Sequence, residues 1–358
     1  MKKCYLVLAD GHIFEGTRFG AEGCAMGELV FNTGVVGYEA NLTDPNNYGQ
    51  IVLQTFPMIG NYGVIPEDLG GKKAYLSGYV VREWCDAPSN FRCQGNLDEY
   101  LKAQGVVGMY GIDTREITRI IRDNGVMAAK IVDKVGENAA EGLAAYAVKG
   151  AVEAVSCKEK AVYPAEGEKK YTVAAVNYGT MGNMIEQLTA RGCEVQVFPF
   201  DAKAEEILSG GADGVLLSDG PGDPAENTAA IEEIKKLFGA KPLFAVGLSH
   251  QMLALAAGAK TCKLTYGHRG GNQPVKRIAD GRTYITTQNH GYAVSSDSLP
   301  EGAVLSYVNA NDQTNEGVEY AWKNAFSVQF HPIACKGPQD TTFLYEAFTG
   351  LMAAAKKQ

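Results

Sequence analysis

The sequence predicts an α/β protein with two domains, a β-rich N-terminal domain with helices followed by a doubly wound domain. Its 358 residues are enough for about two domains of ordinary size. The first third alternates short apolar runs with turn residues, whereas strand and helix patterns alternate from residue 171 onward. Hydrophobic residues make up 46% and charged residues 21%, which excludes a disordered chain and a coiled coil.

The charge balance and the apolar runs limit the partners and the compartment. Thirty-three Lys and Arg stand against 41 Asp and Glu, so no positive excess is available to neutralise phosphates, and we expect no nucleic-acid partner. The apolar run at residues 4–9 is shorter than the core of a signal peptide, and no stretch approaches the roughly 20 residues of a membrane helix. We therefore expect no membrane association and a cytoplasmic protein. The eight cysteines lack metal-ligand spacing, so we expect reduced thiols and no metal.

Strands dominate the expected N-terminal domain. Residues 4–9 and 12–16 flank an Asp-Gly turn, and further strands are expected at 29–31, 50–56 and 75–81. Asp113 has the form of an N-cap with Glu116 three residues on, so a helix is expected to begin there and to end at Gly125.

The boundary between the domains is expected after an Ala-rich stretch. Residues 126–158 predict further helix, and residues 159–170 combine Pro, Gly and charge without periodicity. These features predict a first domain over 1–158, a linker over 159–170 and a second domain over 171–358.

The second domain begins with alternating strands and helices. Strands are expected at 171–176, 194–198, 213–218 and 243–246, with helices at 183–191, near 231–238 and at 251–257. The loop 219–224 (DGPGDP) follows a strand, and ligands of open α/β sheets bind at the carboxyl ends of strands. Its backbone N–H groups are therefore candidates for a substrate contact, although such turns are more often simple connectors.

A strand-turn-helix elbow follows at residues 243–257. Such a turn places one side chain beside a helix N-terminus, where a thiolate or an oxyanion is stabilised. Here that position is Gly247, and glycine taken alone only indicates a turn that needs its backbone freedom.

Several stretches resemble known families. The segments LSDGPGDP, FAVGLSHQMLALAAGA, YGHRGGNQPV, TTQNHGYAV and SVQFHP occur in the order of the class I glutamine amidotransferase domain. The segments GELVFNTGVVGYEANLTDP, SNFRCQGNLDEYL and GVVGMYGIDTREITRIIRDNG are similar to the small subunit of carbamoyl-phosphate synthase. This resemblance implies an elbow cysteine that attacks the amide of glutamine, a histidine that moves the proton, a glutamate that orients it, and ammonia that passes to a large subunit.

Two of the three triad positions differ from that family. The elbow usually reads Gly-x-Cys-x-Gly-His-Gln, and the resemblance places Gly247 at the cysteine and Ser249 at the second glycine. His331 is retained, but Ile333 stands where the orienting glutamate belongs. Glycine offers no nucleophile and isoleucine cannot accept the imidazole N–H, so the sequence predicts that glutaminase activity is lost.

The remaining glutamine pocket is partly kept. The resemblance implies contacts in the loop after one strand, at the elbow and in the Gln-Asn-His-Gly segment, and it places Tyr292 where a phenylalanine is usual and Asn46 where a serine is usual. Thr180-Met181-Gly182 replaces a stretch that usually carries Lys and Arg. His250, His268 and His290 are interpreted as structural histidines. The implied substrate-binding residues are Asn46, Gly220, Gly222, Leu248, Gln251, Asn289, Gly291 and Tyr292.

Three functions follow as alternatives. The first is a glutaminase-dead small subunit that serves as a scaffold for an ammonia-using large subunit in arginine or pyrimidine biosynthesis. ATP and magnesium would belong to that large subunit, and no cofactor is expected in this chain. The second is a sensor that binds glutamine without consuming it. The third is an active hydrolase with a relocated nucleophile, Ser249 or Cys335.

Overall fold

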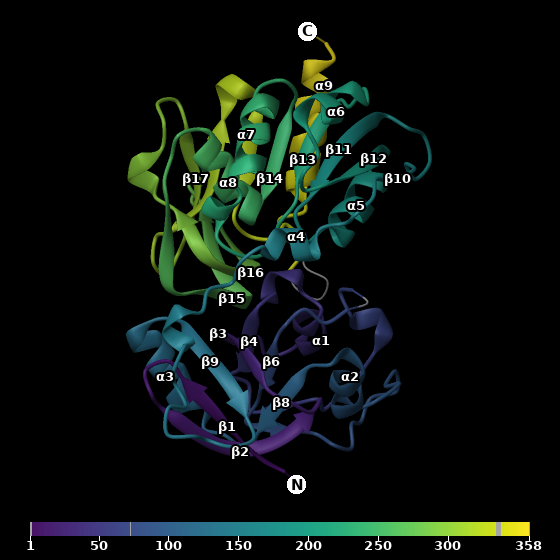
Figure 1. Ribbon diagram of the computed structural model, residues 1–358. Coiled ribbons are helices and arrows are strands. Elements are labelled where there is room, and N and C mark those ends of the chain that lie inside the picture. The colour runs from purple at the N-terminus through teal and green to yellow at the C-terminus, as the bar shows by residue number, and fades with distance from the viewer. Residues whose placement is uncertain (1, 72, 334–337, 358) are drawn as a thin grey trace. The chain divides into compact units, whose positions relative to one another are not determined.

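The structure is a computed structural model that describes residues 2–71, 73–333 and 338–357. It divides into two compact units (Figure 1). The first unit comprises Met1–Lys149 with Thr265–Gly270, and the second comprises Gly150–Leu264 with Gly271–Gln358. Within the described residues no helix is long and apolar enough to cross a membrane.

The first unit is built on a closed β-barrel. The strand order around it is β1-β2-β8-β6-β4-β3-β9. Alternate residues of the strands, such as Leu6 and Leu8, Ile51 and Leu53, are buried in one apolar core, as the two-residue period of a strand requires. The barrel strands are β1 (Lys3–Leu8), β2 (Ile13–Gly20), β3 (Ala25–Asn32), β4 (Gln50–Gln54), β6 (Gly78–Val80), β8 (Val107–Tyr110) and β9 (Met127–Val132).

Short elements connect the barrel strands. The helix predicted after Asp113 is confirmed as α3 (Thr114–Asn124), because the Asp113 carboxylate accepts hydrogen bonds from the backbone N–H groups of Arg115 and Glu116. The other elements are α1 (Tyr38–Leu42), α2 (Leu97–Gln104), β5 (Met58–Ile59), β7 (Glu83–Trp84) and the 3₁₀ turns η1 (Pro45–Asn47), η2 (Pro66–Asp68) and η3 (Leu143–Ala145).

The helix predicted for residues 126–158 is wrong. The first part of this stretch is β9, which pairs antiparallel with both β1 and β3 and so closes the barrel. Ala129 and Ile131 alternate into the barrel core, where both are fully buried. The stretch contains only two helical turns, η3 and α4 (Ala151–Val155). Tertiary pairing here overrides the helical propensity of alanine.

The second unit contains a ten-stranded sheet with a parallel centre. The parallel strands lie in the order β12-β11-β13-β14-β19, and the strands β18, β16, β15 and β17 continue the sheet beyond β19. The parallel strands are β11 (Tyr171–Asn177), β12 (Cys193–Pro199), β13 (Gly214–Leu217), β14 (Leu243–Val246) and β19 (Ala325–Val328); the continuing strands are β15 (Thr261–Arg277), β16 (Thr283–Val294), β17 (Val304–Asn309) and β18 (Asn315–Tyr320).

Helices cover both faces of this sheet, so the doubly wound prediction is confirmed. Alternate strand residues such as Val215 and Leu216 belong to opposite apolar cores. The helices α6 (Ala204–Ser209), α7 (Thr228–Leu237) and α8 (Leu248–Ala256) pack into one core, and α5 (Gly182–Thr189) and α9 (Phe343–Ala355) pack into the other. The 3₁₀ turns are η4 (Pro224–Glu226), η5 (Ser296–Ser298) and η6 (Ala321–Lys323).

The predicted linker range contains a strand of the second unit. β10 (Ala161–Tyr163) pairs antiparallel with β12 at the edge of the sheet.

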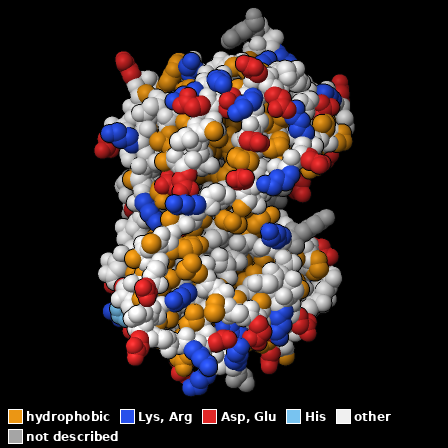
Figure 2. All heavy atoms as spheres, viewed as in Figure 1, with side chains coloured by type: hydrophobic (Ala, Val, Ile, Leu, Met, Phe, Trp, Pro, Cys, Tyr) orange, Lys and Arg blue, Asp and Glu red, His pale blue; other side chains and the backbone are white. Residues whose placement is uncertain are grey.

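On the face of the molecule shown in Figure 2, acidic and basic side chains are interspersed.

Candidate functional site

Three segments that follow neighbouring parallel strands meet at the elbow. β13, β14 and β19 are adjacent, with Leu217 opposite Ala245 and Val246 opposite Val328. Because the carboxyl ends of parallel strands share one sheet edge, the residues that follow them converge there. These residues include Asp219, Gly247 and His331.

Gly247 occupies the turn between β14 and α8. Its φ of 60° and ψ of −118° lie in a region that residues with a side chain rarely adopt. Its N–H donates to the carbonyl oxygen of Val328 at 2.9 Å, which ties the turn to β19. A Cβ added at this position would overlap the carboxylate of Asp219.

The Asp219 carboxylate fills the space beside the elbow. Its Oδ1 accepts hydrogen bonds from the backbone N–H of Gly220 at 2.7 Å and from that of Leu248 at 2.6 Å. Its Oδ2 lies 2.7 Å from Nε2 of His331, and the residue is 4% exposed. The Leu248 N–H is the first of α8, where no side chain of the N-cap residue is available to accept it. An acid from the loop after β13 therefore caps the helix beside Gly247.

Sequence reasoning missed the role of Asp219. The available signal is an acid directly after a buried strand, in the loop 219–224 whose N–H groups are candidates for a substrate contact. The N–H groups of two implied substrate-binding residues, Gly220 and Leu248, are brought together, and the acceptor that they share is the carboxylate of Asp219.

His331 and Ile333, the other two positions that the resemblance assigns to a triad, have different surroundings. The His331 N–H donates to the carbonyl oxygen of Thr287 at 3.0 Å, which positions the backbone. The side chain of Ile333 is partly buried and packs against the apolar core that includes α5 and α9. It contributes to packing and supplies no acceptor for an imidazole.

Of the two alternative nucleophiles, Ser249 lies among the described residues. Ser249 is fully buried, and its hydroxyl donates to the carbonyl oxygen of Ser218. Its proton is thus engaged with the backbone in this arrangement. Cys335 lies outside the described residues.

The predicted glutamine contacts are distributed over both units. Asn46 lies in η1 of the first unit, where it is 4% exposed. Gln251 on α8 donates from Nε2 to the carbonyl oxygen of Tyr292 at 2.7 Å and to Oε1 of Gln329 at 2.8 Å, so its amide is committed within the chain. Gly222 has a positive φ of 94°. Roles in glutamine binding stay predictions for all of these residues, including Asn289, Gly291 and Tyr292 on β16.

His250 has the environment of a structural residue. It is fully buried on α8, and its Nδ1 lies 2.8 Å from Oγ of Ser327. Burial lowers the pKa of His250 to about 3, so the imidazole is neutral near pH 7.

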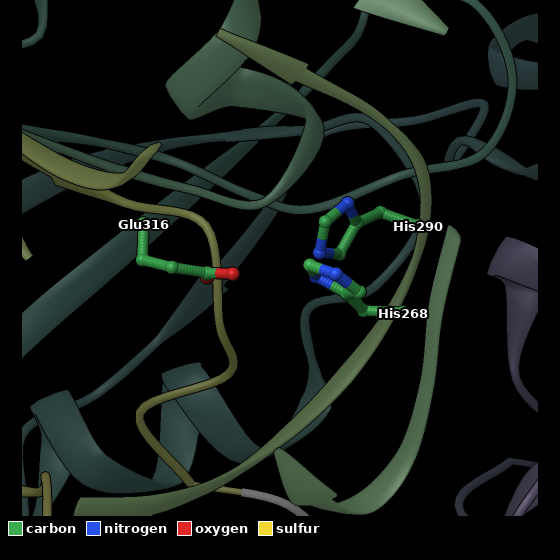
Figure 3. A group of neighbouring side chains, drawn as sticks. All are labelled: His268, His290 and Glu316. Carbon is green, nitrogen blue, oxygen red and sulfur yellow. The ribbon is translucent and has the colours of Figure 1, made fainter. Parts of the chain in front are cut away.

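His290 and Glu316 belong to a partly buried polar network of the second unit (Figure 3). Nδ1 of His290 lies 2.8 Å from the carbonyl oxygen of Tyr292, and Nε2 lies 2.9 Å from Oε1 of Gln288. The Gln288 amide donates to Oε2 of Glu316 at 3.0 Å. His268, also labelled in Figure 3, belongs to the segment 265–270 that is counted with the first unit.

Comparison with known proteins gives consistent matches over most of the chain. Residues 6–131 match the family model for the CPSase domain of the carbamoyl-phosphate synthase small chain, and residues 174–351 match that for class I glutamine amidotransferases. Carbamoyl phosphate synthase small chains from Clostridium perfringens and Syntrophotalea carbinolica are 47% and 45% identical to it. These matches cover 97% and 98% of this chain and 98% of each relative. The chain belongs to the family of carbamoyl-phosphate synthase small chains.

Proposed function

We propose that this chain is a carbamoyl-phosphate synthase small chain that no longer hydrolyses glutamine and that serves as a scaffold for a large chain supplied with free ammonia. The observation that carries the proposal is the Asp219 carboxylate, which accepts hydrogen bonds from the N–H groups of Gly220 and Leu248. This carboxylate lies beside Gly247, where the family usually has its nucleophile.

The chemistry of acyl transfer requires three groups at this place. A nucleophile must attack the amide carbon, a base must take up its proton, and N–H donors must stabilise the oxyanion. Gly247 has no side chain, and the two donors are engaged by Asp219. Loss of a triad nucleophile alone lowers turnover on the order of 10⁶-fold in serine proteases. Substrate binding cannot offset a loss of this size.

Family membership supports a large chain as the binding partner. The relatives are named small chains, which implies a large chain as the binding partner. In this proposal ATP and magnesium are bound by that partner, and the small chain contributes an interaction surface. Retention of nearly the full length of the relatives agrees with a scaffold role.

The direct test uses the complex of this chain with its cognate large chain. Carbamoyl phosphate formation is measured with ammonium and with glutamine, and the large chain alone serves as the control for contaminating glutaminase. We expect synthesis with ammonium and no glutamine-driven rate above that control. Glutamine-driven synthesis at a rate comparable to the ammonium rate would refute the loss of glutaminase activity, and failure of the two chains to co-purify would refute the scaffold role.

The two other functions have less support. A glutamine sensor would need a pocket in which the Gln251 amide is available, yet that amide is bonded to Tyr292 and Gln329. Glutamine at 100 times its dissociation constant would stabilise the protein by about 2.7 kcal/mol, and calorimetry would detect such binding. Stoichiometric labelling of Ser249 or Cys335 by a glutamine-derived chloroketone would support a relocated nucleophile.

A further inference from the structure

We propose that Asp219 is a built-in occupant of an anion site at the elbow, where its carboxylate takes the position of an external small carboxylate or of a reaction oxyanion. This inference deepens the proposed function, because it identifies a residue that opposes glutamine hydrolysis independently of the missing thiol.

The site has the features of a built anion site. Two backbone N–H groups, one of them at the start of the nine-residue helix α8, point at one oxygen, and an imidazole nitrogen lies beside the other. Helix N-termini favour negative charge, and hydrogen bonds from N–H groups to a carboxylate are stronger than those to a neutral acceptor. The carboxylate is almost completely shielded from water. All of these groups belong to the second unit.

Asp219 and a side chain at position 247 exclude one another in this arrangement. A Cβ at position 247 would overlap all three terminal atoms of the Asp219 side chain. Rotation of Asp219 would clear the space, but it would leave the Gly220 and Leu248 N–H groups without this acceptor. A buried donor that loses its acceptor is costly, so the glycine and the acid form a matched pair.

Electrostatics add to the steric exclusion. Glutamine hydrolysis needs a thiolate at the elbow and develops an oxyanion in the donor cradle. A carboxylate in contact with the thiolate or with the oxyanion disfavours the negative charge on that group. Asp219 therefore works against both steps even when a thiol is supplied.

The first experiment removes the built-in carboxylate and offers formate as a replacement. Thermal unfolding of Asp219→Ala is measured with sodium formate and with sodium chloride at equal ionic strength. We expect formate to raise the Tm of Asp219→Ala by at least about 2 °C relative to chloride. The parent protein and the exposed control Asp201→Ala should show no such difference. Equal effects of formate on all three proteins would overturn the inference.

The second experiment uses a thiol as the probe and does not depend on the folding of Asp219→Ala. The rate of alkylation by iodoacetamide is measured against pH for Gly247→Cys and for Gly247→Cys/Asp219→Asn, and the modified residue is identified by mass spectrometry. We expect the Asn variant to lower the apparent pKa of the introduced thiol and to raise the alkylation rate at pH 7 at least tenfold. Identical rates and pH profiles would contradict the inference.

Neither experiment uses glutamine or the large chain. Glutamine-driven synthesis by the parent complex would therefore refute the proposed function while leaving the formate and alkylation results interpretable. Conversely, a protein without glutaminase activity whose Asp219→Ala variant ignores formate would refute the inference alone.

Discussion

At the scale of single residues, the elbow depends on two positions rather than one. Gly247 permits a backbone conformation with positive φ, and it also leaves the space that the Asp219 carboxylate fills. A sequence pattern reveals the first property, because glycine is common at turns. The second property depends on a contact between residues 28 positions apart, and only the fold reveals it.

Substitution of Gly247 by alanine separates backbone strain from the steric overlap. Gly211→Ala is a matched control, since Gly211 also has positive φ, at 70°, but has open space around its Cβ position. We expect Gly247→Ala to lower the free energy of unfolding by about 2–4 kcal/mol, and Gly211→Ala by about 1–2 kcal/mol. Urea unfolding gives both values. Equal losses would show that Asp219 moves aside without cost.

Under the proposed function, restoring a catalytic triad should require a change at Asp219. The family pattern alone suggests the variant Gly247→Cys/Ser249→Gly/Ile333→Glu, and the structure adds Asp219→Asn. We expect at least tenfold more glutamate release from the quadruple variant than from the triple variant, because the amide no longer places a negative charge in the cradle. The control is the quadruple variant with His331→Asn, which should be inactive. Equal rates of the triple and quadruple variants would contradict the role assigned to Asp219.

At the scale of elements, patterns within a short stretch of sequence predict some helices and strands. They do not predict elements whose ends or pairing depend on residues far away in the chain. The cap at Asp113 fixed the start of α3 from sequence alone, since donor and acceptor lie within three residues. The start of α8 was expected at residue 251 but lies at Leu248, where the accepting carboxylate comes from the loop after β13. The sequence predicts helix over β9, because the pairing of β9 with β1 and β3 is not visible in a short stretch of sequence.

The neutral His250 in α8 makes the second unit sensitive to acid. Its pKa in the folded chain is about 3, below the ordinary value of 6.5, so between these values the unfolded chain binds a proton that the folded chain does not. The contribution of neutral His250 to the free energy of unfolding is fully present above pH 6.5. It declines by up to about 1.4 kcal/mol per pH unit as the pH falls toward 3. We expect His250→Asn to show a shallower loss of stability between pH 6 and pH 4 than the parent.

Urea unfolding of both proteins at several pH values tests this expectation. His12→Asn is a suitable control, because His12 is exposed in the first unit. Parallel stability curves for the parent and His250→Asn would show that the folded chain accommodates a charged imidazole at this position.

At the scale of the whole molecule, the two units exchange chain segments relative to the predicted domains. Residues 150–163 precede the expected second domain, yet they pack in the second unit: Val152 lies in its core and β10 extends its sheet. Residues 265–270 come from the middle of the second domain but are counted with the first unit, where the Val126 N–H donates to the carbonyl oxygen of Thr265 at 2.8 Å. The sequence predicted two domains from composition and pattern, but such exchange depends on tertiary contacts.

This exchange predicts that a chain cut near residue 167 stays together. Gly167 is exposed, and its Cβ position is open, so a protease recognition site inserted after it should be cleaved without prior unfolding. The first fragment would keep residues 150–163 within the second unit, anchored by β10 and by the Ser156 hydroxyl, which donates to the carbonyl oxygen of Asn177 at 2.7 Å. The second fragment would keep residues 265–270 within the first unit. We expect two bands on a denaturing gel but a single peak in native gel filtration, at the elution volume of the uncut protein. Separation of the fragments under native conditions would show that these shared segments contribute little to the stability of either unit.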